Sequence, residues 1–203
     1  MAPKERIEAA GERSPLVRAA YAKAREAHAG QVRNGSGGMA YVEHPVAVAA
    51  LLDESGYGEE AVAAGLLHDV VEDSDTTLDE LREDFGQRVA GLVGALTDDE
   101  EIESYRQRKA EHRERVGAAG DEALAVYAAD KLTNARTVGA ALDAEGDAVR
   151  SEFKVPLELK AEIWEADLEL LREQAPQLPF LDDLDEALSD LRVSLAAAAP
   201  PRG

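Results

Sequence analysis

The sequence predicts an all-α fold, and three observations lead to this prediction. Ala, Leu, Glu, Asp and Arg dominate the 203 residues, whereas aromatic residues make up only 4%. Apolar residues recur at helical spacing, and long alternations of β-branched residues are missing. The chain is 45% hydrophobic, so at this length it can bury roughly two-thirds of its unfolded surface around one core. We therefore expect a single all-α domain.

The first helix is expected to begin at Ser14 and Pro15. A serine that accepts a backbone hydrogen bond and a proline in the first helical position are both typical of a helix start. The apolar spacing continues to about His28, and the glycine-rich stretch 30–38 then predicts a loop. Residues 1–13 are interpreted as an N-terminal extension of a domain that covers 14–195, and 196–203 as a flexible tail.

The next two helices carry the candidate functional residues. His44 and Pro45 begin one helix, which Gly56 and Gly58 end. The segment 59–73 is expected to form one continuous helix. Thr77 and Glu80 form a capping-box pattern at the start of the helix after it. Further helices are expected at 77–86, 86–97, 121–142, 158–174 and 181–195.

The segment Asp98–Arg115 differs in character because it is densely charged and has few apolar positions. This pattern predicts an exposed helix or a mobile segment rather than a core element. We accordingly expect His112, which lies inside the segment, to be solvated.

Charge and composition restrict the possible partners. The chain has 22 basic and 42 acidic residues, a formal charge of −20, which argues against binding to long nucleic acids. Without cysteine it has no disulfide, zinc finger or catalytic thiol. Residues 1–15 lack the apolar stretch of a signal peptide, and no run reaches the roughly 18 apolar residues of a membrane span. We expect a cytoplasmic protein with no membrane partner.

A histidine and an aspartate interrupt an apolar helix. The segment from Ala61 to Val71 is apolar on nearly all sides and is expected to be buried, yet it contains His68 and Asp69. A buried carboxylate must be paired, protonated or bound to a metal, and the adjacent imidazole favours a metal. Glu72 and Asp73 follow about one helical turn later, where they could orient or deprotonate a water molecule.

Two further positions could complete this site. His44 stands where the chain turns into its helix, and Asp130 interrupts the apolar stretch ALAVYAADKL. Two histidines and two aspartates form a mixed nitrogen and oxygen set that suits manganese, iron or zinc. The spacing alone leaves the choice among these metals open.

Three segments together resemble a known family. YVEHP at 41–45, LLHDVVEDSDTTLDEL at 66–81 and ADKLTNAR at 129–136 look like the successive motifs of HD-domain hydrolases. More narrowly, they resemble the hydrolase domain of RelA/SpoT proteins and the small alarmone hydrolases, which include the metazoan SpoT homologue. The resemblance implies a single-domain HD-type helical bundle.

The resemblance also implies an activity and a set of site residues. Members of this family remove the 3′-pyrophosphate from guanosine tetra- or pentaphosphate (ppGpp or pppGpp), which gives GDP or GTP and pyrophosphate. The implied ligands of one divalent ion, usually Mn²⁺, are His44, His68, Asp69 and Asp130. The implied catalytic pair is Glu72 and Asp73. The implied contacts to the small-molecule substrate are Arg33, Lys131, Asn134 and Arg150.

Two alternatives remain open at this stage. The substrate could be an adenosine alarmone, NADPH or another nucleotide, because the base pocket cannot be identified from the sequence. The chain could also be a noncatalytic, nucleotide-binding regulatory HD domain. Against this second alternative, a pure sensor has no chemical need for Glu72 and Asp73 beside the ion. The oligomeric state is left open.

Overall fold

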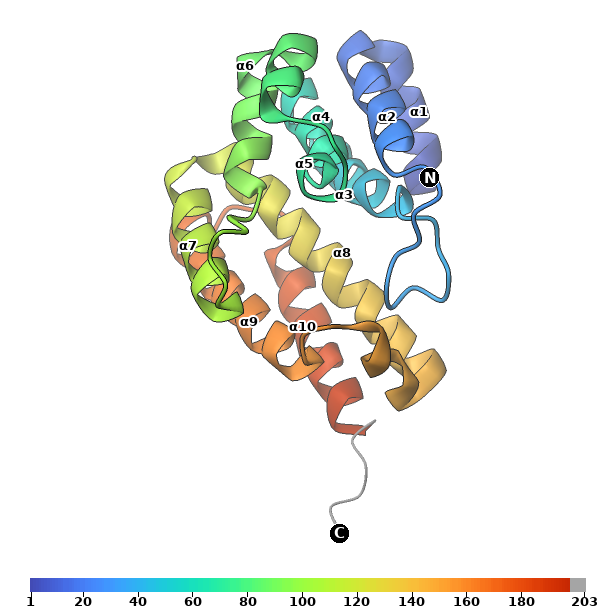
Figure 1. Cartoon of the computed structure of the whole chain (residues 1–203), viewed down its shortest axis with the longest axis vertical. Helices are drawn as coiled ribbons and strands as arrows, with labels where there is room; N and C mark the ends of the chain where they lie inside the picture. Colours follow the sequence, from blue (N-terminus) through green and yellow to red (C-terminus); the bar gives the residue numbers. More distant parts are fainter. Residues whose placement is uncertain (198–203) are drawn as a thin grey trace.

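Helix α8 (Asp121–Glu145) crosses the centre of the molecule, and most of the other helices pack against it (Figure 1). We describe residues 1–197 of a computed structural model. The remaining helices are α1 (Pro3–Arg13), α2 (Pro15–Ala27), α3 (Glu43–Glu54), α4 (Glu59–Leu67), α5 (Val70–Asp73), α6 (Leu78–Leu96), α7 (Tyr105–Ala118), the 3₁₀ helix η1 (Gly146–Glu152), α9 (Leu157–Gln174) and α10 (Leu181–Ala197). Apart from an isolated β-bridge between Val32 and Ala40, the regular structure of residues 1–197 is helical. The predicted all-α class is confirmed.

Two of the predicted helix starts are present at the expected residues. The Ser14 hydroxyl accepts a hydrogen bond from the backbone N–H of Val17 at 3.2 Å. Thr77 and Glu80 form the capping box, in which each side chain accepts a hydrogen bond from the other residue's backbone N–H. The helices predicted at 77–86 and 86–97 are joined into α6, which kinks at Gly86 with φ at +85°. Only glycine adopts this conformation without strain.

The N-terminal segment that the sequence predicts as an extension forms a helix of the bundle. Residues 3–13 of the predicted N-terminal extension form α1, and its apolar side packs on α2 and α3. Ile7 and Ala10, three residues apart on one face of α1, are buried. This helix therefore contributes to the core. Most of the predicted tail, 198–203, lies outside the described residues.

The helix predicted over 59–73 is interrupted, which corrects the expectation of one continuous helix. Helix α4 ends at Leu67, Asp69 has φ −94° and ψ −7°, and α5 begins at Val70. The His68 Nδ1 donates a hydrogen bond to the Gly65 carbonyl at 2.9 Å. In a continuous helix that carbonyl would accept the Asp69 N–H, so the imidazole competes with the backbone where the helix ends.

Helices α3 and α4 approach one another closely at Gly65. A Cβ atom at this position would lie 2.8 Å from Leu52 Cδ1 and 3.2 Å from Ala49 Cα. The absence of a side chain at Gly65 therefore permits the contact that brings the ends of the two helices together. His44 lies in the first turn of α3 and His68 directly after α4.

The charged segment 98–115 is more ordered than the sequence suggests. From Tyr105 it forms α7, which packs against α6, α8 and α9. His112 is only 4% exposed, so the expectation that it is solvated was wrong. Since most of α7 is charged, its two buried residues, His112 and Val116, give too weak a periodic signal to predict the buried face.

None of the helices in the described part of the chain combines the length and the apolar character that a membrane crossing requires.

Candidate metal centre and adjoining pocket

The four predicted metal ligands come together at one point between α3, α4 and α8. The Nε2 atom of His44 lies 3.0 Å from Asp130 Oδ1 and 3.6 Å from Asp69 Oδ2. The Nε2 atom of His68 lies 3.2 Å from Asp69 Oδ1 and 3.6 Å from the same oxygen of Asp130. Atoms of His44, His68 and Asp130 that could bind a metal are all within 4.8 Å of one another.

Both imidazole rings are oriented with Nε2 toward the carboxylates. The His68 Nδ1–H donates to the Gly65 carbonyl, which leaves the lone pair on Nε2. The hydroxyl of Thr133 donates to backbone carbonyls of its own helix and can accept from His44 Nδ1 at 3.3 Å. Outer partners of this kind set the tautomer of histidine ligands. Within residues 1–197, the buried His68 Nε2 has no hydrogen-bond partner, as expected of a ligand atom.

The two buried histidines of the centre have oppositely shifted pKa values. Burial alone lowers the pKa of a histidine, and it lowers the pKa of His44 to about 4. His68 is equally buried, but Asp69 and Asp130 outweigh the desolvation and raise its pKa to about 9. The site therefore favours a positive charge on or beside His68, which a divalent cation could supply. The residues present fit such an ion.

Further side chains hold the two aspartates. Tyr41, which lies in one of the family-like motifs but was assigned no role there, donates its hydroxyl to Asp69 Oδ2 at 2.8 Å. Asn134 donates to Asp130 Oδ1 at 2.6 Å, and Lys131 contacts Asp130 Oδ2 at 2.8 Å. The ammonium group of Lys131 also lies 4.2 Å from the centroid of the Tyr127 ring, in the core. Lys131 is thus positioned to hold Asp130 in place.

Glu72 and Asp73 lie on α5, one turn after Asp69. Neither residue is buried in the core, but neighbouring protein groups exclude part of the water around both carboxyl groups. Desolvation by the surrounding protein and the charge of Asp69 raise the pKa of Glu72 to about 7. The pKa of Asp73 is also raised, mainly by desolvation, while Tyr41 acts in the opposite direction. A carboxyl group with a pKa near neutral can accept a proton at physiological pH.

A pocket of about 240 Å³ adjoins the centre. It is lined by Val32, Arg33, Asn34, Tyr41, Asn134, Val138, Phe153, Lys160 and Trp164. Arg33 donates to Asn134 Oδ1 at 2.5 Å and lies over the Tyr41 ring, with 5.3 Å from its Cζ to the ring centroid. The pocket therefore joins the centre through Asn134 and Tyr41. Since typical ligand pockets measure about 300–1,000 Å³, it would enclose part of a nucleotide.

Lys160 is a candidate substrate residue that the sequence analysis missed. Its ammonium nitrogen lies 5.6 Å from the Phe153 ring centroid and 5.9 Å from that of Trp164. Desolvation, together with Lys109, Lys131 and Arg33, lowers its pKa to about 8. This cation faces rings and other cations, so an anionic ligand would stabilise it. The signal in the sequence is a lysine one helical turn before the chain's single tryptophan.

Arg150 does not line this pocket. Its guanidinium group contacts Asp147, Glu158 and the carbonyl oxygen of Leu195, where η1, α9 and α10 meet. Two acidic side chains and a carbonyl near the end of α10 therefore account for the orientation of Arg150. The other three predicted substrate residues, Arg33, Lys131 and Asn134, are grouped around Asp130 and the pocket.

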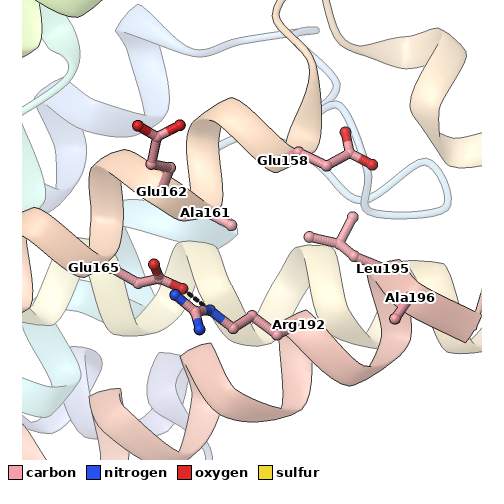
Figure 2. A pocket seen from close by; sticks show the side chains of 7 residues that line it. All are labelled: Glu158, Ala161, Glu162, Glu165, Arg192, Leu195 and Ala196. Carbon is pink, nitrogen blue, oxygen red and sulfur yellow. Dashed lines mark hydrogen bonds and ion pairs between the residues drawn. The ribbon is translucent and has the colours of Figure 1, made fainter.

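A second depression lies between α9 and α10 (Figure 2). Its volume is about 420 Å³, and its lining residues are Glu158, Ala161, Glu162, Glu165, Arg192, Leu195 and Ala196. Each of its glutamates is already paired with an arginine: Glu158 with Arg150, Glu162 with Arg106 and Glu165 with Arg192. Because these charges are neutralised in pairs, the depression offers no free cation or acid comparable with those beside the metal centre.

Comparisons with known proteins find the family that the sequence motifs resemble. The HD domain family model matches residues 20–155. The guanosine-3′,5′-bis(diphosphate) 3′-pyrophosphohydrolase of Aquifex aeolicus (strain VF5) is 36% identical over 124 residues, which cover 60% of this chain and 18% of that protein. MESH1 of Danio rerio, a pyrophosphohydrolase of the same name, is 38% identical over 115 residues, which cover 56% of this chain and 63% of that protein.

One solved structure is similar in fold. It is described as a metazoan ortholog of SpoT that hydrolyzes ppGpp and plays a role in starvation responses. It superposes with a TM-score of 0.71 and 26% identity, over 87% of this chain and 95% of that one. The chain spans about a fifth of the length of the first curated relatives, at 18%, 18% and 21%.

Proposed function

Because the chain belongs to the HD domain family, we propose that it is a metal-dependent hydrolase that removes the 3′-pyrophosphate from guanosine tetra- or pentaphosphate. The products are GDP or GTP and pyrophosphate. The observation that carries the proposal is the convergence of His44 and His68 Nε2 atoms on two aspartates beside a pocket that contains Arg33 and Lys160. The names of the relatives support the choice of substrate.

His44, His68, Asp69 and Asp130 would hold the ion, and we propose Mn²⁺. Imidazole nitrogens with carboxylate oxygens suit a divalent transition ion. When bound, such an ion lowers the pKa of water and polarises a phosphoryl oxygen.

In the proposed reaction, a water molecule attacks the phosphorus atom bonded to the 3′ oxygen of the ribose. A new phosphorus–oxygen bond forms as the bond to the 3′ oxygen breaks. Glu72 accepts the proton of the water, since its raised pKa suits a base near neutral pH. Asp73, the next residue, would relay that proton toward solvent. The 3′ oxygen leaves with the electron pair of the broken bond and takes a proton from solvent, which completes the nucleotide product.

The pocket would hold the nucleotide and offset its charge. Arg33 and Lys160 stand at the wall of the pocket, where each could contact a phosphate of the bis-pyrophosphate. These local cations matter because the whole chain carries a net charge of −20. Screening at physiological salt acts over about 8 Å, so distant carboxylates weigh less than groups at the site.

The test is product analysis by chromatography. Metal-stripped and manganese-restored protein are incubated with guanosine tetraphosphate, its adenosine counterpart and NADPH. We expect GDP and pyrophosphate from the guanosine substrate only when manganese is restored. Turnover of another substrate alone would contradict the assigned specificity, and binding without turnover in any metal would contradict the assignment as an enzyme.

Two variants separate the proposed roles. Asp69→Asn should lose both bound manganese and turnover. Glu72→Gln should keep manganese and nucleotide binding and lose turnover, because the neutral amide cannot accept the proton. If Glu72→Gln instead lost manganese, Glu72 would belong among the ligands and could not be the proposed base.

A further inference from the structure

The backbone of Asp98 contacts the proposed catalytic base. Asp98 lies two residues after the end of α6, and its backbone N–H donates a hydrogen bond to Glu72 Oε1 at 2.6 Å, across 26 residues of sequence. A short hydrogen bond from a backbone amide to a carboxylate restricts the orientation of that carboxylate. The placement of Glu72 therefore depends on where the Asp98 backbone is held.

Three basic side chains of α7 surround the Asp98 carboxylate. Lys109 Nζ lies 2.7 Å from Oδ2, Arg108 Nε lies 3.3 Å from the same oxygen, and His112 Nδ1 lies 3.0 Å from Oδ1. The side chains of Asp98 and His112 are only 10% and 4% exposed. Burial would raise the pKa of Asp98, but His112 and Lys109 outweigh it and hold that pKa well below its usual range.

Helix α7 also holds the residue before Asp98. Arg115 donates hydrogen bonds to the backbone carbonyls of Gly94 at 3.0 Å and Thr97 at 2.5 Å, at the C-terminal end of α6. The side chains of α7 therefore hold the chain on both sides of the peptide bond whose N–H faces Glu72. Exposed ion pairs contribute little, but this cluster is largely shielded from solvent.

We propose that Asp98 is a positioning residue for Glu72, and that Arg108, Lys109, His112 and Arg115 of α7 hold its backbone so that the amide orients the catalytic carboxylate. The inference rests on the proposed hydrolase function for the role of Glu72. It assigns to α7 a part in catalysis although its residues are not among the proposed ligands or substrate contacts.

The experiment compares Asp98→Asn and Lys109→Met with Arg106→Met in the full-length chain. Lys109→Met keeps an aliphatic side chain and removes the ammonium group. Arg106→Met is the matched control, because Arg106 of the same helix pairs with Glu162 and not with Asp98. The readouts are kcat and KM for guanosine tetraphosphate, manganese affinity, and hydrogen exchange of the Asp98 amide measured by NMR.

We expect kcat to fall about 10-fold in Asp98→Asn and Lys109→Met, since a displacement of about 1 Å costs roughly 100-fold and a smaller one costs less. KM and manganese affinity should stay within about two-fold of the wild-type values, because ligands and pocket are untouched. The Asp98 amide should exchange faster in both variants. Arg106→Met should match the wild-type protein in all four measurements.

Two results would overturn the proposal. One is an Asp98 amide that stays protected in Lys109→Met with kcat unchanged, which would leave α7 a purely structural role. The other is a rise in KM at constant kcat, which would place the effect in substrate binding. If the wild-type protein does not hydrolyse guanosine tetraphosphate, the proposed function fails, and amide exchange alone still decides whether α7 holds the Asp98–Glu72 contact.

Discussion

The close packing of α3 on α4 at Gly65 makes a quantitative prediction for Gly65→Ala. The new Cβ would lie 2.8 Å from Leu52 Cδ1 and 3.2 Å from Ala49 Cα, well inside ordinary contact distance. Overpacking of this kind costs about 1–3 kcal/mol. Alanine in place of glycine inside a helix recovers about 1 kcal/mol of helix propensity. We therefore expect a net loss of about 1 kcal/mol.

Gly91→Ala in α6 is the matched control. A Cβ at Gly91 would have no atom within 4 Å, so this variant gains helix propensity without a clash. The two variants should thus differ by about 1–3 kcal/mol in free energy of unfolding, all of it from the contact with α3. The measurement is urea denaturation of both variants and the wild-type chain under identical conditions. For a domain of this size, each 1 kcal/mol is about 2–4 °C in Tm.

The same substitution should also weaken metal binding. His44 lies on α3 and His68 at the end of α4, and their ring centroids are 5.1 Å apart. A shift of α3 away from α4 would separate these two proposed ligands. We expect manganese affinity to fall about 10-fold, the lower range for a disturbed ligand orientation, in Gly65→Ala and not in Gly91→Ala. Equal stability and equal affinity of the two variants would refute the argument.

Three further predictions concern the site. Thr133→Val removes the hydroxyl that orients His44, so manganese affinity measured by isothermal titration should fall about 10–100-fold. Thr137→Val is the control, because it removes only a hydroxyl bonded to the Thr133 carbonyl and should leave manganese affinity unchanged. Lys160→Ala should raise KM about 10-fold or more through loss of a phosphate contact. Lys160→Arg keeps the positive charge and should restore the wild-type KM. An unchanged KM in Lys160→Ala would remove this residue from the substrate site. Because a base works deprotonated, kcat should rise with pH, with a midpoint at about pH 7, or at a lower pH where the bound cation depresses the pKa of Glu72. The same rise in Glu72→Gln would assign this titration to another group.

The sequence by itself determined the local features of this protein. The all-α class, the Ser14 cap, the Thr77 capping box and the buried helix that precedes the His68–Asp69 pair all follow from residues within a few positions of one another. Helix propensity, capping and apolar periodicity are short-range effects, so they can be deduced without knowledge of the fold. The family-like motifs, in turn, predicted which residues to examine for a metal centre.

Only the tertiary structure decided how distant side chains meet. Thr133 reaches His44 across 89 residues, and Arg33 reaches Asn134 across 101. The orientation of Arg150 toward Glu158 and Leu195 and the burial of His112 likewise depend on how α7, α9 and α10 pack. No local pattern encodes these contacts, because they follow from the crossing of helices whose positions are set by the whole core. The position of Asp98 beside Glu72 is the clearest case. In the sequence Asp98 is one acidic residue of a charged segment, and nothing there indicates that its backbone N–H donates to the Glu72 carboxylate.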